Sequence, residues 1–329
     1  ASQRASSILL ERFGRSVPPL RTTLHSGEDF VHLLSGLRRL DETLDYLGLC
    51  EGDRLGHALS LGVEPRVWAQ RAGRVAMSRE ERLLDLAWEW TCYARQGDSP
   101  PGGRHALIQR EIAEISHFLF KENLPPWKVE CLIRDLHDED LLRFLGFPDR
   151  RPPVDPKEEH KLALDYLTDP QVFQRGRSII WVDPTAEVEA LQHLQDGLRR
   201  KVGRMGLTIE VNPSSNLLIG HLGEIGQHPL WRLAPPGEQD KVPPLSVCIG
   251  SDDPLTFATT LREEYQLLYD ALILKGCSEA VAHDWIERAR KAGLSARFTL
   301  PQSCQPVGRD ADALRNCAVA ESPDLNFPP

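Results

Sequence analysis

Two neighbouring carboxylates, Asp252 and Asp253, follow the apolar run Leu245 to Ile249, and Pro254 ends that predicted strand. Burying two charges at a strand end costs free energy unless a metal ion or a polar ligand compensates them. Because successive strand side chains diverge, the two carboxylates should not share one ion. We therefore expect Asp252 to bind a metal and Asp253 to hydrogen-bond a substrate, unless Asp253 is an ordinary turn residue.

A histidine ends another apolar segment, at His25. Neutral imidazole and carboxylate suit Zn²⁺, and a catalytic zinc has about three protein ligands plus an open position for water. His25 alone would be read as a core histidine, and Asp252 alone as a capping aspartate. Together, at two strand ends, they predict a zinc site.

Two further side chains have the chemistry to act beside such a metal. Glu28 follows Gly27, which lets the chain turn close to a ligand, and a carboxylate there can transfer protons to a substrate nitrogen. The alternative is a carboxylate stabilised by the dipole of the next helix. His57 lies between Gly56 and Ala58, small residues that allow close approach of a substrate. It could orient an attacking hydroxide, or be a buried structural histidine.

A fourth strand end carries the polar run Asn212-Pro213-Ser214-Ser215-Asn216, which could be only a loop that caps the next helix. Polar residues that converge from several strand ends are typical of the rim of a β/α barrel.

Composition sets limits on the function. The chain has 329 residues, 41% of them hydrophobic and 26% charged, as in globular proteins with a sizeable core. Its net charge of −9 argues against a general nucleic-acid binder. Seven scattered cysteines without a CxxC pair favour reduced thiols, and no long uncharged apolar run is present. We expect a soluble, cytoplasmic protein with no membrane partner.

The order of periodic segments predicts an interrupted α/β fold. A strand, a helix over 29–47 and a second strand near 55–59 form one parallel unit. We expect barrel strands and helices over 1–65, a helical insertion over 66–180, further barrel strands and closing helices over 181–300, and a weakly ordered tail over 301–329. The predicted helices of the insertion span 78–95, 105–121, 127–144 and 157–167, with a strand at 178–182.

Five ordered motifs resemble the C-terminal half of adenosine deaminases, a metal-dependent hydrolase family. They are Thr23-Leu24-His25-Ser26-Gly27-Glu28, Arg54-Leu55-Gly56-His57, Glu210-Val211-Asn212-Pro213-Ser214-Ser215-Asn216, His228-Pro229, and Ser251-Asp252-Asp253-Pro254 followed by Leu261-Arg262-Glu263-Glu264-Tyr265. The resemblance covers about 1–60 and 182–300. It implies the second half of a TIM-type (β/α)₈ barrel, strands 5 to 8, with a large helical insertion.

The resemblance also implies roles. His25 and Asp252 would bind zinc, Glu28 would protonate the purine ring, and His57 would orient the hydroxide that attacks C6. Asp253 would contact the five-membered ring of the purine. The implied reaction is hydrolytic removal of the 6-amino group, which releases ammonia.

Two departures from the family pattern matter. The His-x-His pair and the first four strands of the family have no match, so the resemblance implies an N-terminal barrel half, in the same or a separate chain, that supplies the remaining ligands. The insertion resembles that of the deaminase subunit of the RADAR antiphage defence system. That resemblance implies a large homo-oligomer, a defence-system partner, and adenine nucleotides, ATP to ITP included, as substrates. The alternative is a non-catalytic, deaminase-like assembly scaffold.

Overall fold

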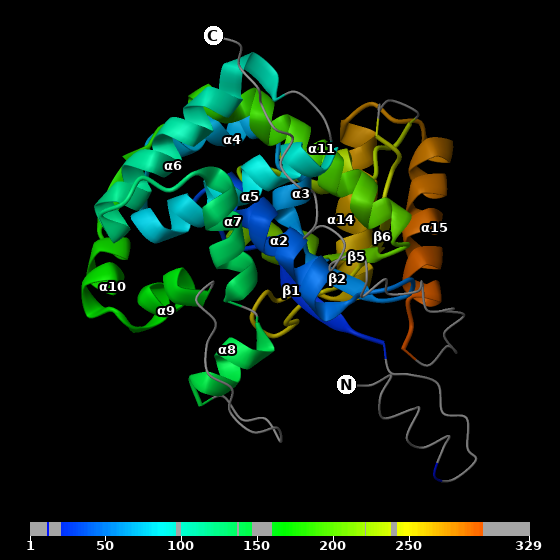
Figure 1. Ribbon diagram of the computed structural model, residues 1–329. Coiled ribbons are helices and arrows are strands. Elements are labelled where there is room, and N and C mark those ends of the chain that lie inside the picture. Colours follow the sequence, from blue (N-terminus) through cyan, green and yellow to red (C-terminus); the bar gives the residue numbers. More distant parts are fainter. Residues whose placement is uncertain are drawn as a thin grey trace, which may run out of the picture. The chain divides into compact units, whose positions relative to one another are not determined.

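The short apolar segments pair into one parallel sheet. The computed structural model describes residues 12, 21–96, 100–136, 138–146, 160–220, 222–237 and 242–298, and contacts gather Arg21–Arg297 into one unit. Four parallel strands lie in the order β1 (Thr23–Ser26), β2 (Arg54–His57), β5 (Thr208–Val211) and β6 (Ser246–Ile249), as Figure 1 shows. The prediction of an α/β fold with a parallel sheet is confirmed. Among the described residues this sheet ends at β1 and β6, so a closed barrel stays a prediction.

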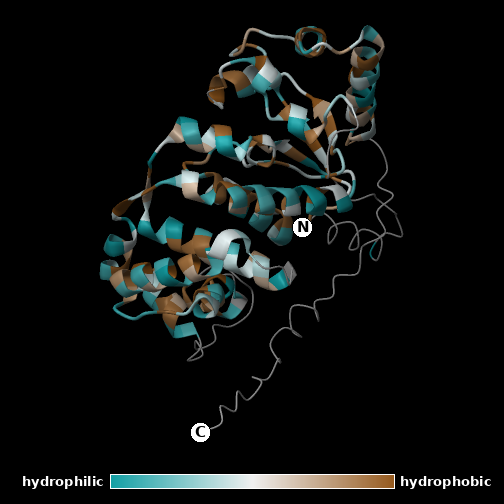
Figure 2. Ribbon diagram, turned by 90° about the horizontal axis from the view of Figure 1, so that it is seen from above, coloured by the Kyte–Doolittle hydropathy of each residue, from teal (hydrophilic) through white to brown (hydrophobic). Residues whose placement is uncertain are grey.

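Amphipathic helices cover the sheet. α2 buries Leu33, Leu37, Leu40 and Leu44 at helical spacing, and Gly48 in the left-handed region ends it. The helices outside the predicted insertion are α2 (Leu33–Leu47), α3 (Leu59–Gly62), α11 (Val188–Arg204), α12 (Pro213–Ile219), α13 (Leu230–Leu233), α14 (Leu261–Leu274) and α15 (Glu279–Ser295). Buried apolar residues of α2, α3, α11, α13, α14 and α15 share one hydrophobic core with those of β2, β5 and β6. Figure 2 shows hydrophilic and hydrophobic stretches on the same helices, as expected for helices with one buried face.

The segment between β2 and β5 is mainly helical. Its elements are α4 (Pro65–Ala72), β3 (Val75–Ser78), α5 (Arg79–Gln96), α6 (Arg104–Phe120), α7 (Pro126–Asp135), α8 (Glu139–Phe144), α9 (Lys161–Thr168), α10 (Pro170–Gly176) and β4 (Ile179–Val182). β3 and β4 pair antiparallel, with Val75 opposite Val182 and Ser78 opposite Ile179. In Figure 1 the green helices α8, α9 and α10 lie away from α14 and α15. The predicted domain boundaries stay predictions, and the predicted tail lies outside the described residues.

Several elements differ from those predicted by periodicity. The predicted helix over 127–144 is two helices, because Asp138 accepts hydrogen bonds from the N–H groups of Asp140 and Leu141 and starts α8 anew. The predicted strand over 55–59 ends at His57, where the backbone turns left-handed. α4 and α10 are short helices that the hydrophobic pattern did not indicate, although Pro65 and Pro170 stand at their first turns.

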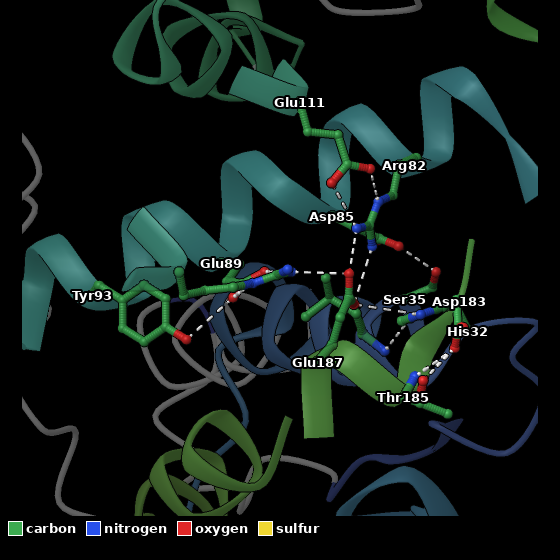
Figure 3. Close-up of polar contacts among 12 residues, drawn as sticks. His32, Ser35, Arg82, Asp85, Glu89, Tyr93, Glu111, Asp183, Thr185 and Glu187 are labelled. Atoms are coloured by element: carbon green, nitrogen blue, oxygen red, sulfur yellow. Dashed lines mark hydrogen bonds and ion pairs between the residues drawn. The ribbon is translucent and has the colours of Figure 1, made fainter. Parts of the chain in front are cut away.

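A buried ionic network joins this helical segment to α2. Arg82 on α5 pairs with Glu187, which lies in a 3₁₀ turn (Pro184–Glu187), and with Glu111 on α6 at 2.7 Å (Figure 3). Arg104 pairs with Glu89 at 2.6 Å and reaches the same Glu187 at 3.2 Å. His32, which caps α2, lies 3.5 Å from Glu187. Glu187 therefore brings this network next to the start of α2.

Within the described part of the chain, none of the helices combines the length and the apolar character that crossing a membrane requires.

Candidate functional site

Three side chains at the ends of β1 and β2 form one compact group. Ligand atoms of His25, Glu28 and His57 all lie within 4.8 Å of one another. The two imidazole rings meet edge to face, with centroids 4.5 Å apart and an interplanar angle of 88°. Nδ1 of His57 lies 3.2 Å from Oε1 of Glu28. Among the described residues, this is the one group of three or more histidine, cysteine or acidic side chains with metal-like spacing.

Four residues in or next to the site have left-handed backbone conformations. Gly27, His57, Ala58 and Asp252 all have positive φ, at 72°, 62°, 47° and 56°. Non-glycine residues pay for this conformation with free energy of roughly 1–3 kcal/mol each, and such residues cluster at functional sites. The N–H of Ser60 donates to the carbonyl of Gly27 at 2.8 Å, which ties the turn after β1 to the turn after β2.

Gly56 makes room for the His25 imidazole. The two residues are register partners in β1 and β2. A Cβ atom on Gly56 would collide with Cδ2 of His25 and lie 3.0 Å from its Nε2. Gly56 therefore leaves space for the ring of His25. From the sequence we expected it to leave space for a substrate next to His57.

Asn216 and Ser215 contact two of the predicted site residues. Nδ2 of Asn216 lies 2.7 Å from Nδ1 of His57, and the hydroxyl of Ser215 donates to Oδ2 of Asp252 at 2.7 Å. The alternative of a helix-capping loop fits less well, because the side chain of Asn212 makes no cap hydrogen bond at the start of α12. The partners of this polar run were not predictable from the sequence, although its position at a strand end drew attention to it.

Asp252 lies outside the compact group but acts on it electrostatically. Burial raises the pKa of Glu28, and the charges of Asp29 and Asp252 add to that effect against His25. Burial also lowers the pKa of His57, and His25 lowers it further, against the attraction of Asp252 and Asp29. Both shifts favour the neutral forms, so Glu28 holds its proton to a higher pH than an exposed glutamate.

Asp253 is engaged in a turn. Its Oδ1 accepts from the N–H groups of Leu255 at 3.0 Å and Thr256 at 3.3 Å, and its Oδ2 accepts from the Thr256 hydroxyl. These hydrogen bonds, that of the Thr256 hydroxyl first, lower the pKa of Asp253. Glu28, by contrast, is not a first-turn carboxylate of α2, because His32 caps that helix and its first turn has no acidic residue.

Glu28 is one of the residues that line a large cavity. The cavity measures about 1060 Å³, and Phe30, Trp68 and Trp231 are among its walls. Its lining includes both acidic and basic side chains. These are Glu28, Asp29, Arg39, Glu64, Arg71, Arg232 and Lys275. A cavity with aromatic walls and charged side chains, next to a carboxyl group whose pKa is raised, is suited to an organic substrate with polar substituents.

The chain shows partial similarity to proteins of known activity. It is 30% identical over 118 residues to an adenine deaminase of Rhizobium meliloti (strain 1021). The aligned segment covers 36% of this chain and 32% of that protein. It is 30% identical over 133 residues to an adenine deaminase of Rhizobium rhizogenes (strain K84 / ATCC BAA-868), covering 38% and 39%. An aminodeoxyfutalosine deaminase of Acidothermus cellulolyticus (strain ATCC 43068 / DSM 8971 / 11B) is 36% identical over 76 residues, covering 20% and 19%.

These similarities support a deaminase family for this chain. No protein-family model matches it. The chain spans between about a fifth and two fifths of the length of these relatives.

Proposed function

We propose that this chain carries part of the active site of a zinc-dependent deaminase that hydrolyses the 6-amino group of adenosine or an adenine nucleotide. Water supplies the oxygen that bonds to C6, the C6–N bond breaks, and ammonia leaves with a proton from the site. The observation that carries the proposal is the group of His25, Glu28 and His57 in a chain with partial similarity to proteins named adenine deaminase.

The donor set fits a zinc ion. His25 and Asp252 would hold the metal: the Gly56 backbone leaves space for the His25 ring, and Ser215 donates to one oxygen of Asp252. Imidazole and carboxylate are common zinc ligands, and remaining ligands would come from an N-terminal barrel half. Bound zinc lowers the pKa of a water molecule, so that a nucleophile is present near neutral pH.

The other side chains would handle the substrate and its protons. Glu28, which lines the cavity, would give its proton to a ring nitrogen of the purine and so make C6 more electrophilic. His57 would orient the attacking oxygen through a ring nitrogen. The turn at Gly27 would let the purine approach the backbone, and Asp253 would contact the five-membered ring once its carboxylate leaves the local turn.

The proposal extends to the assembly. The sheet ends at β1 and β6 in the described residues, and the relatives are longer than the matched segments. We propose that an N-terminal half adds strands, and that the protein forms a homo-oligomer. On the resemblance of its insertion, we also propose that it works with a partner in antiphage defence, on substrates such as ATP. The competing role is a deaminase-like scaffold without activity.

Replacing Glu28 by glutamine tests the catalytic proposal. The native protein, with any associated N-terminal half, is assayed for ammonia release from adenine, adenosine and ATP, together with its zinc content. Glu28→Gln should keep the zinc and lose about 10²- to 10⁴-fold in turnover, as expected for a general acid–base residue. The matched control is Glu114→Gln, an exposed glutamate on α6, which should keep full activity. Equal turnover in Glu28→Gln and wild type would refute the assigned role, and inactive, zinc-free wild type would favour the scaffold.

A further inference from the structure

The first turn of α12 contacts the predicted site at two points through consecutive side chains. Ser215 reaches Asp252 after β6, and Asn216 reaches His57 at the end of β2. Both side chains are buried, with relative exposures of 1% and 0%. One turn of α12 therefore contacts both a predicted metal ligand, Asp252, and a predicted catalytic residue, His57.

The orientation of the Asn216 amide follows from its second partner. The backbone N–H of Asn212 can only donate, and it lies 3.2 Å from Oδ1 of Asn216. The carbonyl oxygen of the amide therefore faces Asn212, and the NH₂ group faces His57. A donor at 2.7 Å from Nδ1 requires that Nδ1 accept, so a neutral His57 carries its proton on Nε2.

This tautomer has a consequence for Glu28. Oε1 of Glu28 lies 3.2 Å from the same Nδ1, whose lone pair the Asn216 amide already uses. Without Asn216, Nδ1–H of His57 could donate to the Glu28 carboxylate and lock the two residues into a pair. With Asn216 in place, the proton on Nε2 is left to donate to an oxygen outside this group.

A buried carboxylate anchors the turn from α14. Oε2 of Glu264 accepts from the backbone N–H of Ser214 at 3.0 Å, and its Oε1 accepts from the hydroxyl of Thr259 at 2.7 Å. Glu264 is 1% exposed. The N-terminal turn of α12 is thus capped by a side chain of another helix, which fixes the positions of Ser215 and Asn216.

We propose that Asn216 is a positioning residue that holds His57 in the Nε2–H tautomer, and that Ser215 positions Asp252 from the same turn. The inference rests on the proposed function for its chemical meaning. The tautomer itself is a property of the chain that is measurable without substrate or metal.

The decisive variant is Asn216→Asp, which has the same shape but no NH₂ group. One oxygen would still accept from the Asn212 N–H, and the other would face Nδ1 of His57 as an acceptor. We expect the His57 proton to move from Nε2 to Nδ1. Two-bond ¹H–¹⁵N correlation spectra of the metal-free native protein, labelled with ¹⁵N-histidine, distinguish the tautomers at a single pH at which His57 is neutral. A His57→Gln sample assigns the signal.

The Ser215 half of the proposal has its own readout. Ser215→Ala should weaken Zn²⁺ binding, measured by competition with a chelator, by about 10- to 100-fold, the usual cost of losing an outer-shell partner. Ser214→Ala is the matched control, because Ser214 takes part through its backbone N–H. Unchanged affinity in Ser215→Ala would overturn this half.

The outcomes separate the inference from the proposed function. An Nδ1–H tautomer in the wild type, or an unchanged tautomer in Asn216→Asp, overturns the Asn216 assignment even if the protein deaminates purines. The expected tautomers in a protein that releases no ammonia from any purine would support the positioning by Asn216 and refute the deaminase proposal.

Discussion

At the scale of single residues, absent side-chain atoms matter as much as those present. His25 is exposed at the end of β1, and its ring lies over Gly56, where no Cβ interferes. The position of the His25 ring, a predicted metal ligand, therefore depends on the absence of a methyl group at Gly56 on the neighbouring strand.

Gly56→Ala should therefore impair the metal site while leaving the sheet intact. The new Cβ would collide with Cδ2 of His25, so the ring must rotate away. We expect Zn²⁺ affinity to fall at least tenfold, comparable with other changes that misplace a ligand. Equilibrium dialysis with Zn²⁺ measures the affinity, and far-UV circular dichroism checks the fold. Gly223→Ala is the control, because nothing lies within 4 Å of a Cβ there. Equal affinities in the two variants would contradict the role of Gly56.

The sequence indicated the residue types of the site better than their contacts. Strand ends are recognisable, because short apolar runs stop at polar residues, and carboxyl ends of parallel strands meet at one edge. The partners of Asn216 and Ser215 depend on how α12 packs against β2 and the loop after β6. That arrangement is tertiary, and no local pattern encodes it. Asp253 is different, because its turn hydrogen bonds are local and involve the side chain of Thr256, three residues later.

At the scale of elements, two buried histidines accept hydrogen bonds from backbone N–H groups in the first turns of helices. Nδ1 of His32 accepts from the N–H of Leu34 at 3.1 Å at the start of α2, and Nδ1 of His228 accepts from the N–H of Leu230 at 3.0 Å before α13. A histidine can accept there only while Nδ1 is unprotonated. Burial, the largest cause, lowers the pKa of His32 to about 4 and that of His228 to about 3.

These two hydrogen bonds predict a loss of stability in mild acid. Both pKa values lie below the ordinary histidine value of 6.5. Below about pH 6.5 these two histidines therefore bind more protons in the unfolded chain than in the folded one. The contribution of these two histidines to the free energy of unfolding should therefore be constant above about pH 7 and fall as the pH drops below 6.5. At pH 5 the loss should be on the order of 2 kcal/mol per histidine.

Urea denaturation at pH 7.5 and pH 5 measures this loss. Asn accepts at a helix start but does not titrate, so His32→Asn and His228→Asn should each reduce the difference between the two pH values. His117→Asn, at an exposed site on α6, should leave the difference unchanged. An unchanged difference in both His32→Asn and His228→Asn would contradict the contribution of these two neutral, buried histidines.

Element boundaries were predictable where a long apolar stripe coincided with a clear stop. α5 and α6 satisfy that condition, each within one residue of the bounds predicted for it. α7 and α8 do not, because the apolar periodicity continues across a break that Asp138 causes by binding backbone N–H groups. β3 was missed because four residues of an isolated two-stranded pair, with Ala76 exposed, carry almost no periodic signal.

At the scale of the whole described unit, the buried ionic network connects α5 and α6 to the start of α2 and thus to the segment after Glu28. Glu187 is its centre: it is 4% exposed and lies between the guanidinium groups of Arg82 and Arg104. Burial opposes its ionisation, but the two arginines outweigh burial and lower its pKa to about 2. Arg82 has a second partner, Glu111, whose side chain is 31% exposed.

The two acidic partners of Arg82 should therefore differ in their contribution to stability. Glu187→Gln keeps the volume but leaves two buried guanidinium groups short of a countercharge, which costs about 3–5 kcal/mol when a buried pair is broken. Glu111→Gln removes a half-exposed partner and should cost at most about 1 kcal/mol. Urea denaturation at pH 7.5, followed by tryptophan fluorescence, compares the two variants with the wild type.

Because Glu187 also lies beside His32, its loss should loosen the segment that follows Glu28, and faster amide hydrogen exchange over residues 27–33 would report it. Similar stabilities of the two variants would show that the network does not depend on its buried centre.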